Sequence, residues 1–263
     1  ILKNWKQLVW TNKSAELAKD YSTYQFTGKE WCLVVLEGTV LLLMIGHCFY
    51  DSLFASVCMS PGLVWFMKYQ KEKYRIRRKH TLRGQFKDAV LAVAANQKAG
   101  YSVENAFKEA YTDMRLLYGE GSLICEELLY LIRGIHNNVT IEKLLLSLGE
   151  RSGIQDIREF GEVFSIAKRS GGNLSRVIEM TAASIEEKIN VEQEIQVMIS
   201  AKKMEANVMS VVPFLIILYL DTTSAGFFDV LYHNPVGIVV MSVCLVVYLV
   251  AVLLMQKLME INV

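Results

Sequence analysis

The sequence predicts an all-α integral membrane protein, with an antiparallel cytoplasmic bundle of about six helices between two transmembrane hairpins. Two pairs of apolar segments flank a central stretch in which apolar residues recur at helical spacing. Hydrophobic residues make up 52% of the chain and charged residues 21%. This composition is too apolar for an ordinary soluble domain and too charged for a membrane bundle alone, so we expect both kinds of structure in one chain.

The pattern divides the chain into five parts. Residues 1–30 are an N-terminal cytoplasmic or interfacial segment, 31–69 the first hairpin, 70–206 the cytoplasmic domain, 207–256 the second hairpin and 257–263 a cytoplasmic tail.

The first hairpin consists of two apolar segments. Residues 31–50 are enough to cross a hydrocarbon core of about 30 Å. Only Asp51 and Ser52 separate them from the second segment, residues 53–69. Because Pro61 interrupts that second segment, we expect a kink there and regard Pro61 as a candidate hinge.

The second hairpin closes the chain. Its first span covers residues 208–220 and extends further if Asp221 lies near the membrane surface. Pro213 lies inside this span and is the second candidate hinge. Residues 235–255 form the clearest span, since they contain no charged side chain.

Basic residues predict the orientation. A dense run of Lys and Arg follows the second span, and Lys202 and Lys203 precede the third, whereas residues 50–52 and 221–234 contain neither type. The positive-inside rule therefore places the central domain and both termini in the cytoplasm. A nucleic-acid patch is the alternative, but the run lacks the context of a groove-reading helix. The residues that we assign to topology and to anionic lipid are Arg75, Arg77, Arg78, Lys79 and Arg83.

The central domain is predicted to contain six helices separated by short breaks. The breaks fall at residues 99–100, 118–121, 136–138, 149–153 and 170–173. Ser102 and Thr140 are expected to cap the second and fourth helices through their hydroxyl groups. The sixth helix begins near Leu174 and contains no glycine or proline before Pro213, so we expect it to continue unbroken into the third span.

No catalytic, cofactor-binding or metal-binding residue is predicted. The chain contains no GxxxxGK[ST] loop, no HExxH and no GxSxG, so it is not expected to be an enzyme. The five cysteines have neither CxxC spacing nor a histidine pattern typical of zinc. Gly171 and Gly172 open a helix and could bind an anion there, although a tight turn is the commoner use of such a pair.

Several motifs occur in a characteristic order. They lie at residues 85–90, 99–106, 147–152, 164–174, 185–188 and 234–237. With the membrane segments around them, they resemble the type II secretion system F domain family from about residue 30 to the end of the chain. The single copy of the domain is similar to the TadB and TadC proteins of tight-adherence pilus systems, and residues 200–213 are closer to TadB. Lys87 stands where this family often has proline.

The resemblance implies a scaffold, a platform in the inner (cytoplasmic) membrane for type IV pilus assembly or type II-like secretion. Such platforms work with a cytoplasmic hexameric ATPase, a sister F-domain platform protein and pilin subunits, and we expect these partners, membrane lipid and an oligomer, but no nucleic acid. The candidate partner contacts are Arg169, Gly171, Gly172 and Asn173, which could equally form a turn needed only for folding. A membrane-anchored adaptor and a small-solute transporter are the alternatives, and Glu37 is the only candidate transport residue.

Overall fold

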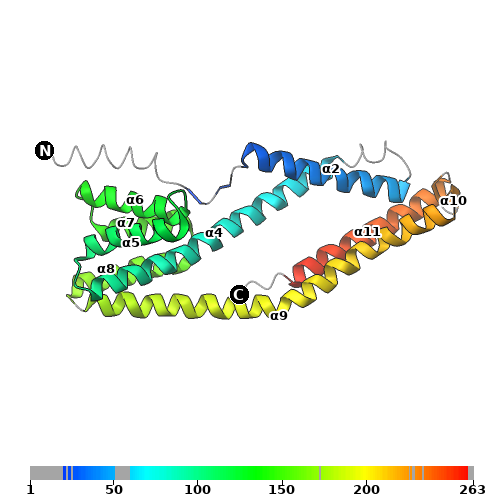
Figure 1. Cartoon of the computed structure of the whole chain (residues 1–263). Coiled ribbons are helices and arrows are strands. Elements are labelled where there is room, and N and C mark those ends of the chain that lie inside the picture. The colour runs from blue at the N-terminus through cyan, green and yellow to red at the C-terminus, as the bar shows by residue number, and fades with distance from the viewer. Residues whose placement is uncertain are drawn as a thin grey trace. The chain divides into compact units, whose positions relative to one another are not determined.

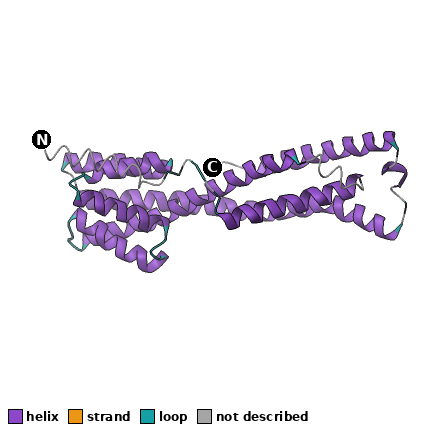
Figure 2. Ribbon diagram, turned by 90° about the horizontal axis from the view of Figure 1, so that it is seen from above, coloured by secondary structure: helices purple, strands orange, loops and turns teal. Residues whose placement is uncertain are grey.

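The computed structural model describes residues 20–21, 23–24, 26–50, 60–171, 173–224, 226, 229–232 and 234–259. The regular structure of these residues is helical, and they contain no strand (Figures 1 and 2). They fall into two compact units. We call the described residues up to 24 together with residues 72–190 the bundle unit, and residues 26–71 and 191–259 the apolar unit.

The described helices follow in chain order, and those from α4 to α9 are joined by short connections. They are α2 (Gly28–Tyr50), α4 (Pro61–Lys98), α5 (Val103–Tyr118), α6 (Leu123–His136), α7 (Ile141–Ser152), α8 (Gln155–Ser170), α9 (Leu174–Thr223), α10 (Asp229–Tyr232) and α11 (Pro235–Met259). Both α4 and α9 contribute residues to both units.

The bundle unit has one hydrophobic core, to which α4 to α9 all contribute. The apolar stripes predicted from helical spacing supply it. Phe86 of α4 packs edge-on against Phe160 of α8 with ring centroids 5.4 Å apart, and Phe107 of α5 meets Phe164 of α8 at 6.4 Å. All four rings are at most 3% exposed. Burial of such aromatic side chains is a main source of the stability of a small bundle.

Four of the predicted breaks are confirmed, but the break predicted at residues 149–153 is shorter than expected because α7 continues to Ser152, and one of the two predicted caps is wrong. The Ser102 hydroxyl accepts a hydrogen bond from the Asn105 N–H, as expected. Thr140 occupies the N-cap position of α7, yet its side chain forms no capping hydrogen bond. The first turn forms without it because the Thr140 carbonyl accepts the Leu144 N–H at 3.3 Å.

The predicted kink at Pro61 depends on residues 53–59, which lie outside the described residues. Pro61 is the first residue of α4, a position where the missing N–H has no helical partner to lose. From Pro61 the helix continues to Lys98, across the predicted boundary between membrane segment and cytoplasmic domain. Asp51, Ser52 and the first part of the predicted second span lie outside the described residues.

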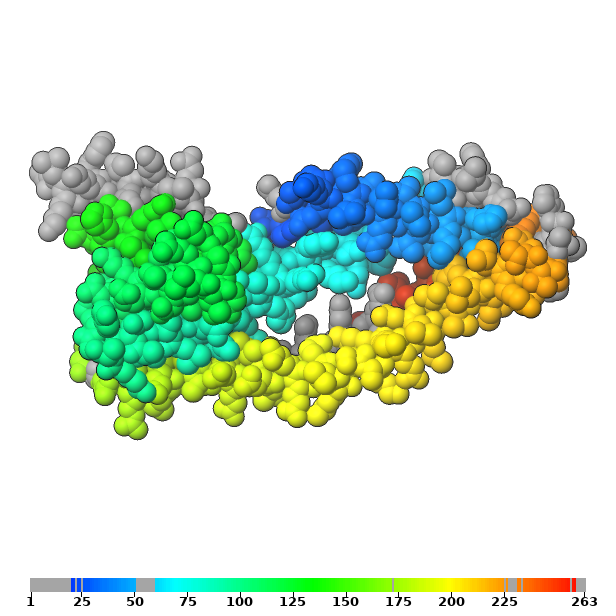
Figure 3. Space-filling model, in the orientation of Figure 1, coloured from blue at the N-terminus to red at the C-terminus, as the bar shows by residue number. Residues whose placement is uncertain are grey.

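Within the described part of the chain, three helices are long and apolar enough to cross a membrane: Gly28–Tyr50, Leu174–Thr223 and Pro235–Met255. The second of these, α9, runs for 50 residues with Pro213 inside it, which confirms the unbroken sixth helix. Large apolar side chains are exposed along α2, α9 and α11. Figure 3 shows the surface of α2 in blue and of α9 in yellow to orange. Such surfaces are typical of helices that face lipid.

The apolar unit has a small core of its own, near the C-terminal end of α2. Phe214 of α9 contacts Phe49 of α2 and Tyr248 of α11 through its ring, at centroid distances of 6.1 Å and 5.4 Å. The Tyr232 hydroxyl donates to the Cys48 carbonyl at 2.7 Å. Glu37 accepts a hydrogen bond from Gln70 of α4 at 3.4 Å, so its carboxylate has a local partner.

Candidate functional site

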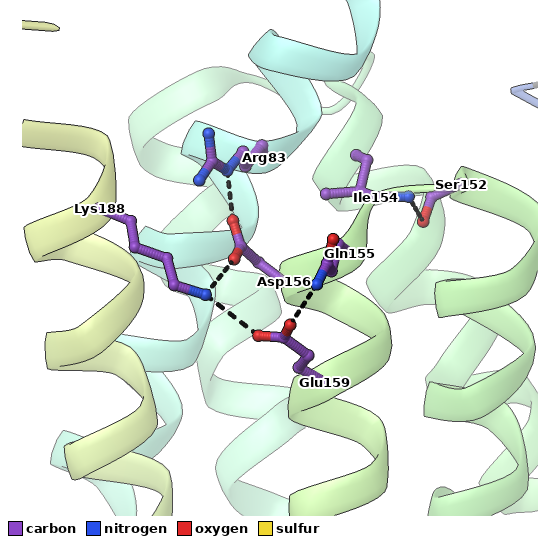
Figure 4. A network of polar contacts seen from close by, with 7 residues as sticks. All are labelled: Arg83, Ser152, Ile154, Gln155, Asp156, Glu159 and Lys188. Carbon is purple, nitrogen blue, oxygen red and sulfur yellow. Dashed lines mark hydrogen bonds and ion pairs between the residues drawn. The ribbon is translucent and has the colours of Figure 1, made fainter. Parts of the chain in front are cut away.

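Four charged side chains meet where α4, α8 and α9 come together in the bundle unit (Figure 4). Arg83 of α4 donates through Nε to Asp156 Oδ2 of α8. Lys188 of α9 donates to Asp156 Oδ1 and to Glu159 Oε2, both at 3.1 Å. We call this group the Asp156 junction. The junction links α4 to α9, which are far apart in the sequence, because both bind carboxylates of α8.

The turn between α7 and α8 positions Asp156. Gly153 ends α7 in the left-handed conformation, with φ 59°. The Ile154 N–H then donates to the Ser152 hydroxyl at 3.3 Å, and α8 begins one residue later. Asp156 therefore lies in the first turn of α8, where the helix dipole favours a negative charge.

Burial makes the pairing at Asp156 important. Asp156 is 5% exposed, and each of its carboxylate oxygens accepts a hydrogen bond from a cation. A buried charge is tolerated only when it is paired in this way. The Glu159 carboxylate is nearer the surface, and hydrogen bonds from Gln155 and then from Lys188 lower its pKa. The junction can therefore hold three helices together.

The lowered pKa of Glu159 predicts an acid-dependent contribution to stability. Above the ordinary pKa of 4.5 the folded form gains from the ionised carboxylate, and this gain is lost as the pH falls through the lower folded pKa. Glu159→Gln should therefore be less stable than wild type at neutral pH, and the difference should shrink at about pH 3. The effect should be small because the group is half-exposed. Urea unfolding at both pH values checks it, and a difference that grows in acid would contradict the assignment.

A second buried ion pair lies between α6 and α7. Arg151 donates to both oxygens of Glu127, at 3.2 Å and 2.8 Å, and Glu127 is 3% exposed. Sequence reasoning missed Glu127 and Asp156, since each lies among other charged residues of amphipathic helices. Arg151 and Lys188 lie within the motifs that carry the family resemblance, and in the structure Lys188 belongs to the Asp156 junction.

Most residues of the predicted basic cluster make contacts with other residues of the protein. Arg75 pairs with Glu72 of its own helix. The Arg78 guanidinium lies 4.8 Å from the centre of the Tyr21 ring, and Lys79 donates to the Gly153 carbonyl at 3.4 Å. The Arg83 side chain is 15% exposed and belongs to the Asp156 junction, which corrects its assignment to lipid. Of the five, Arg77 has an exposed side chain.

The predicted partner-contact turn connects α8 to α9. Gly171 ends α8 with φ 65°, and the Asn173 side chain accepts the Arg176 N–H at 3.1 Å, so both residues shape the turn. Arg169, Gly171 and Asn173 are exposed, and a Cβ on Gly171 would meet no atom within 4 Å. Gly172 lies outside the described residues. The surface of this turn is thus open, and contact with a partner stays a prediction.

The two candidate hinges have different positions. Pro61 begins α4 and interrupts no helix among the residues described. Pro213 is inside α9 and removes one N–H from its hydrogen-bond ladder. The Tyr248 hydroxyl of α11 donates to the Ser210 carbonyl at 2.6 Å, within one turn of Pro213. The carbonyl that lacks a helical donor because of Pro213 is that of Met209, so the Tyr248 bond lies beside it and not on it.

Comparison with protein families, with curated proteins and with solved structures gives no match to this chain. Across the described segments, no group of three or more His, Cys, Asp or Glu side chains is placed to hold a metal ion.

Proposed function

We propose that this chain is a non-enzymatic platform protein of the cytoplasmic membrane, similar to TadB, in a tight-adherence pilus or type II secretion-like system. One observation carries the proposal. Both α4 and α9 are single helices with residues in both units, and the Asp156 junction ties the two helices to α8. A movement imposed on the bundle unit is therefore conducted along continuous helices.

Physical properties of α9 support this role. Each residue in a helix is held to the next turn by a hydrogen bond, so a long helix resists bending except at an interruption such as Pro213. In the proposed mechanism a cytoplasmic hexameric ATPase moves the bundle unit, and α9 carries the movement to the membrane. Pilin subunits are then released from the bilayer into a filament, with a sister platform protein alongside.

The orientation in this proposal follows from charge. Lys71, Lys73 and Arg77 on α4 and Lys202 and Lys203 on α9 are cationic and lie beside apolar segments. The positive-inside rule then favours a cytoplasmic bundle unit.

The motifs behind the resemblance also have structural roles. A Cβ on Gly149 would lie 2.7 Å from the Arg158 backbone. The motif at residues 147–152 therefore includes the glycine at which α7 and α8 come close together. The motif at residues 164–174 contains the left-handed Gly171, and the motif at residues 185–188 contains Lys188 of the junction. These roles support a fold shared with the family that the motifs resemble, since each role requires the same residue type at the same position.

Interruption of α9 tests the proposed transmission. Four glycines inserted between Asn190 and Val191 should abolish filament assembly or secretion, because flexible residues cannot conduct a displacement. The same insertion after Gly121, in the connection between α5 and α6, is the control and should be tolerated better. Membrane levels of both variants are measured by immunoblot. Normal filaments from the α9 variant would refute the mechanism.

Partner identity is tested separately. The protein is crosslinked in its native membrane, solubilised and purified, and the bound proteins are identified by mass spectrometry. Recovery of a secretion ATPase, a sister platform protein and pilin is the expected result. Recovery of a kinase or regulator in their place would favour an adaptor, and solute-dependent thermal stabilisation without partners would favour a transporter.

A further inference from the structure

The chain passes between the two units in three places, and one of them differs from the others. Two passages lie inside α4 and α9. The third is the segment before α2, where the division falls between residues 25 and 26 and the described residues are not helical. In this segment Tyr21 is 1% exposed, although it belongs to no helix. A non-helical residue buried to this degree needs specific partners.

Those partners come from three helices of the bundle unit. The Tyr21 hydroxyl donates to Glu127 Oε1 of α6 at 2.9 Å, and its N–H donates to the Arg151 carbonyl of α7 at 3.3 Å. The Arg78 guanidinium of α4 lies 4.8 Å from the ring centre, a cation–π contact. Tyr21 is therefore held by its ring, its hydroxyl and its backbone together.

A second aromatic contact extends the attachment. The Tyr24 ring stacks on Tyr74 of α4 with centroids 5.7 Å apart. Four residues further along, α2 begins at Gly28. The segment from residue 20 to residue 27 is thus fastened to the bundle unit at one end and continues directly into a candidate membrane span at the other.

Glu127, which accepts the hydrogen bond of the Tyr21 hydroxyl, remains paired with Arg151 when Tyr21 leaves its site. Glu127 keeps both hydrogen bonds from Arg151 when the hydroxyl leaves, and the Arg151 guanidinium also lies 4.9 Å from the Tyr130 ring centre. Withdrawal of Tyr21 therefore leaves no unpaired buried charge, which is the condition that would make withdrawal prohibitive. The cost of withdrawal is then the loss of the buried ring and of its hydrogen bonds, with no added cost from an unpaired charge.

We propose that the segment before α2, of which residues 20–21, 23–24 and 26–27 are described, is a strap and that Tyr21 is its releasable anchor, restraining the start of α2. Seven extended residues from Tyr21 to Gly28 reach at most about 24 Å. If Gly28 moves further than this reach from the site that Tyr21 occupies, Tyr21 must leave that site. The strap goes beyond the platform function and does not require it, since it concerns only contacts within this chain.

Hydrogen exchange read by mass spectrometry tests the strap in the full-length protein in lipid nanodiscs. In wild type, amides of residues 20–24 should exchange by local opening, faster than those of the α6 core around Leu128 and Leu131. Tyr21→Phe loses the bond to Glu127 and should raise exchange in this segment, and Tyr21→Ala should raise it further. Exchange in α5 to α8 should stay near that of wild type.

Tyr101→Ala is the matched control, because Tyr101 is 48% exposed. It should leave exchange at residues 20–24 unchanged. Two results would overturn the proposal: unchanged exchange at residues 20–24 in Tyr21→Ala, which would mean that Tyr21 is no anchor, or an equal rise throughout α6 and α7. The second would make Tyr21 an ordinary core residue, whose removal opens the bundle. Neither result depends on a pilus, an ATPase or any other partner.

Discussion

Asp156→Ala is expected to lower the free energy of unfolding of the bundle unit by about 3 kcal/mol. The substitution removes a buried carboxylate that accepts charge-assisted hydrogen bonds from Arg83 and from Lys188. A hydrogen bond to a charged group contributes about 1.5–3 kcal/mol, so the loss of both is strongly destabilising. The first turn of α8 also loses an acidic residue that complements its dipole.

Cys125 offers a way to measure this loss in the full-length protein. It is 1% exposed in the core of the bundle unit, so a thiol reagent reaches it only when the bundle opens. Alkylation of its peptide is followed by mass spectrometry across a urea series. The control is Glu162→Gln, because Glu162 pairs with Arg158 at 3.9 Å and both side chains are more than half exposed. A surface pair of this kind contributes less than about 1 kcal/mol. Equal effects of the two substitutions would contradict the importance of the Asp156 junction.

Gly149→Ala is expected to destabilise the same unit by about 1–3 kcal/mol through overpacking. The added methyl group would lie 2.7 Å from the Cα of Arg158 and 3.0 Å from its backbone nitrogen. Both atoms belong to the backbone of α8, so no rotation of a side chain relieves the contact, and α7 and α8 must move apart. That movement loosens the packing around Leu145, Leu148 and Phe160.

Gly84→Ala is the control for Gly149→Ala and should change stability in the opposite direction. Gly84 lies inside α4, and a Cβ there would meet no atom within 4 Å. Alanine in place of an unobstructed helical glycine stabilises by about 0.5–1 kcal/mol, because the unfolded chain loses conformational freedom. The urea midpoint for Cys125 alkylation should therefore fall for Gly149→Ala and rise for Gly84→Ala. A shift of the same sign in both would refute the close-approach argument.

Local patterns in the sequence were sufficient for the helices of the bundle unit. Helical spacing and glycine breaks predicted helices at the positions of α5 to α8, and the structure buries apolar residues of these helices, such as Phe107, Phe160 and Phe164. These features depend on residues three or four positions apart, and such spacings can be recognised in a single sequence. The same locality explains the correct prediction that α9 is unbroken, since it contains no glycine and its first proline is Pro213.

Some local signals are compatible with two structures. Proline both kinks helices and begins them, and Pro61 is the first residue of the described helix α4. The hydroxyl of Thr140 was expected to cap α7, yet the backbone closes that turn alone. Basic residues after an apolar segment indicate topology, but the same signal cannot distinguish Arg77, which is exposed, from Arg83, which pairs with Asp156.

By itself, the sequence determined which segments are helical, which are apolar enough for a membrane and which residues of each helix face a core. Only the tertiary structure decided which charges meet. Asp156 lies 73 residues from Arg83 and 32 from Lys188, and Tyr21 lies 106 from Glu127. The physical reason is that helical periodicity specifies the buried face of each helix separately. The pairing of one face with another depends on how all the helices pack, and no local spacing records it.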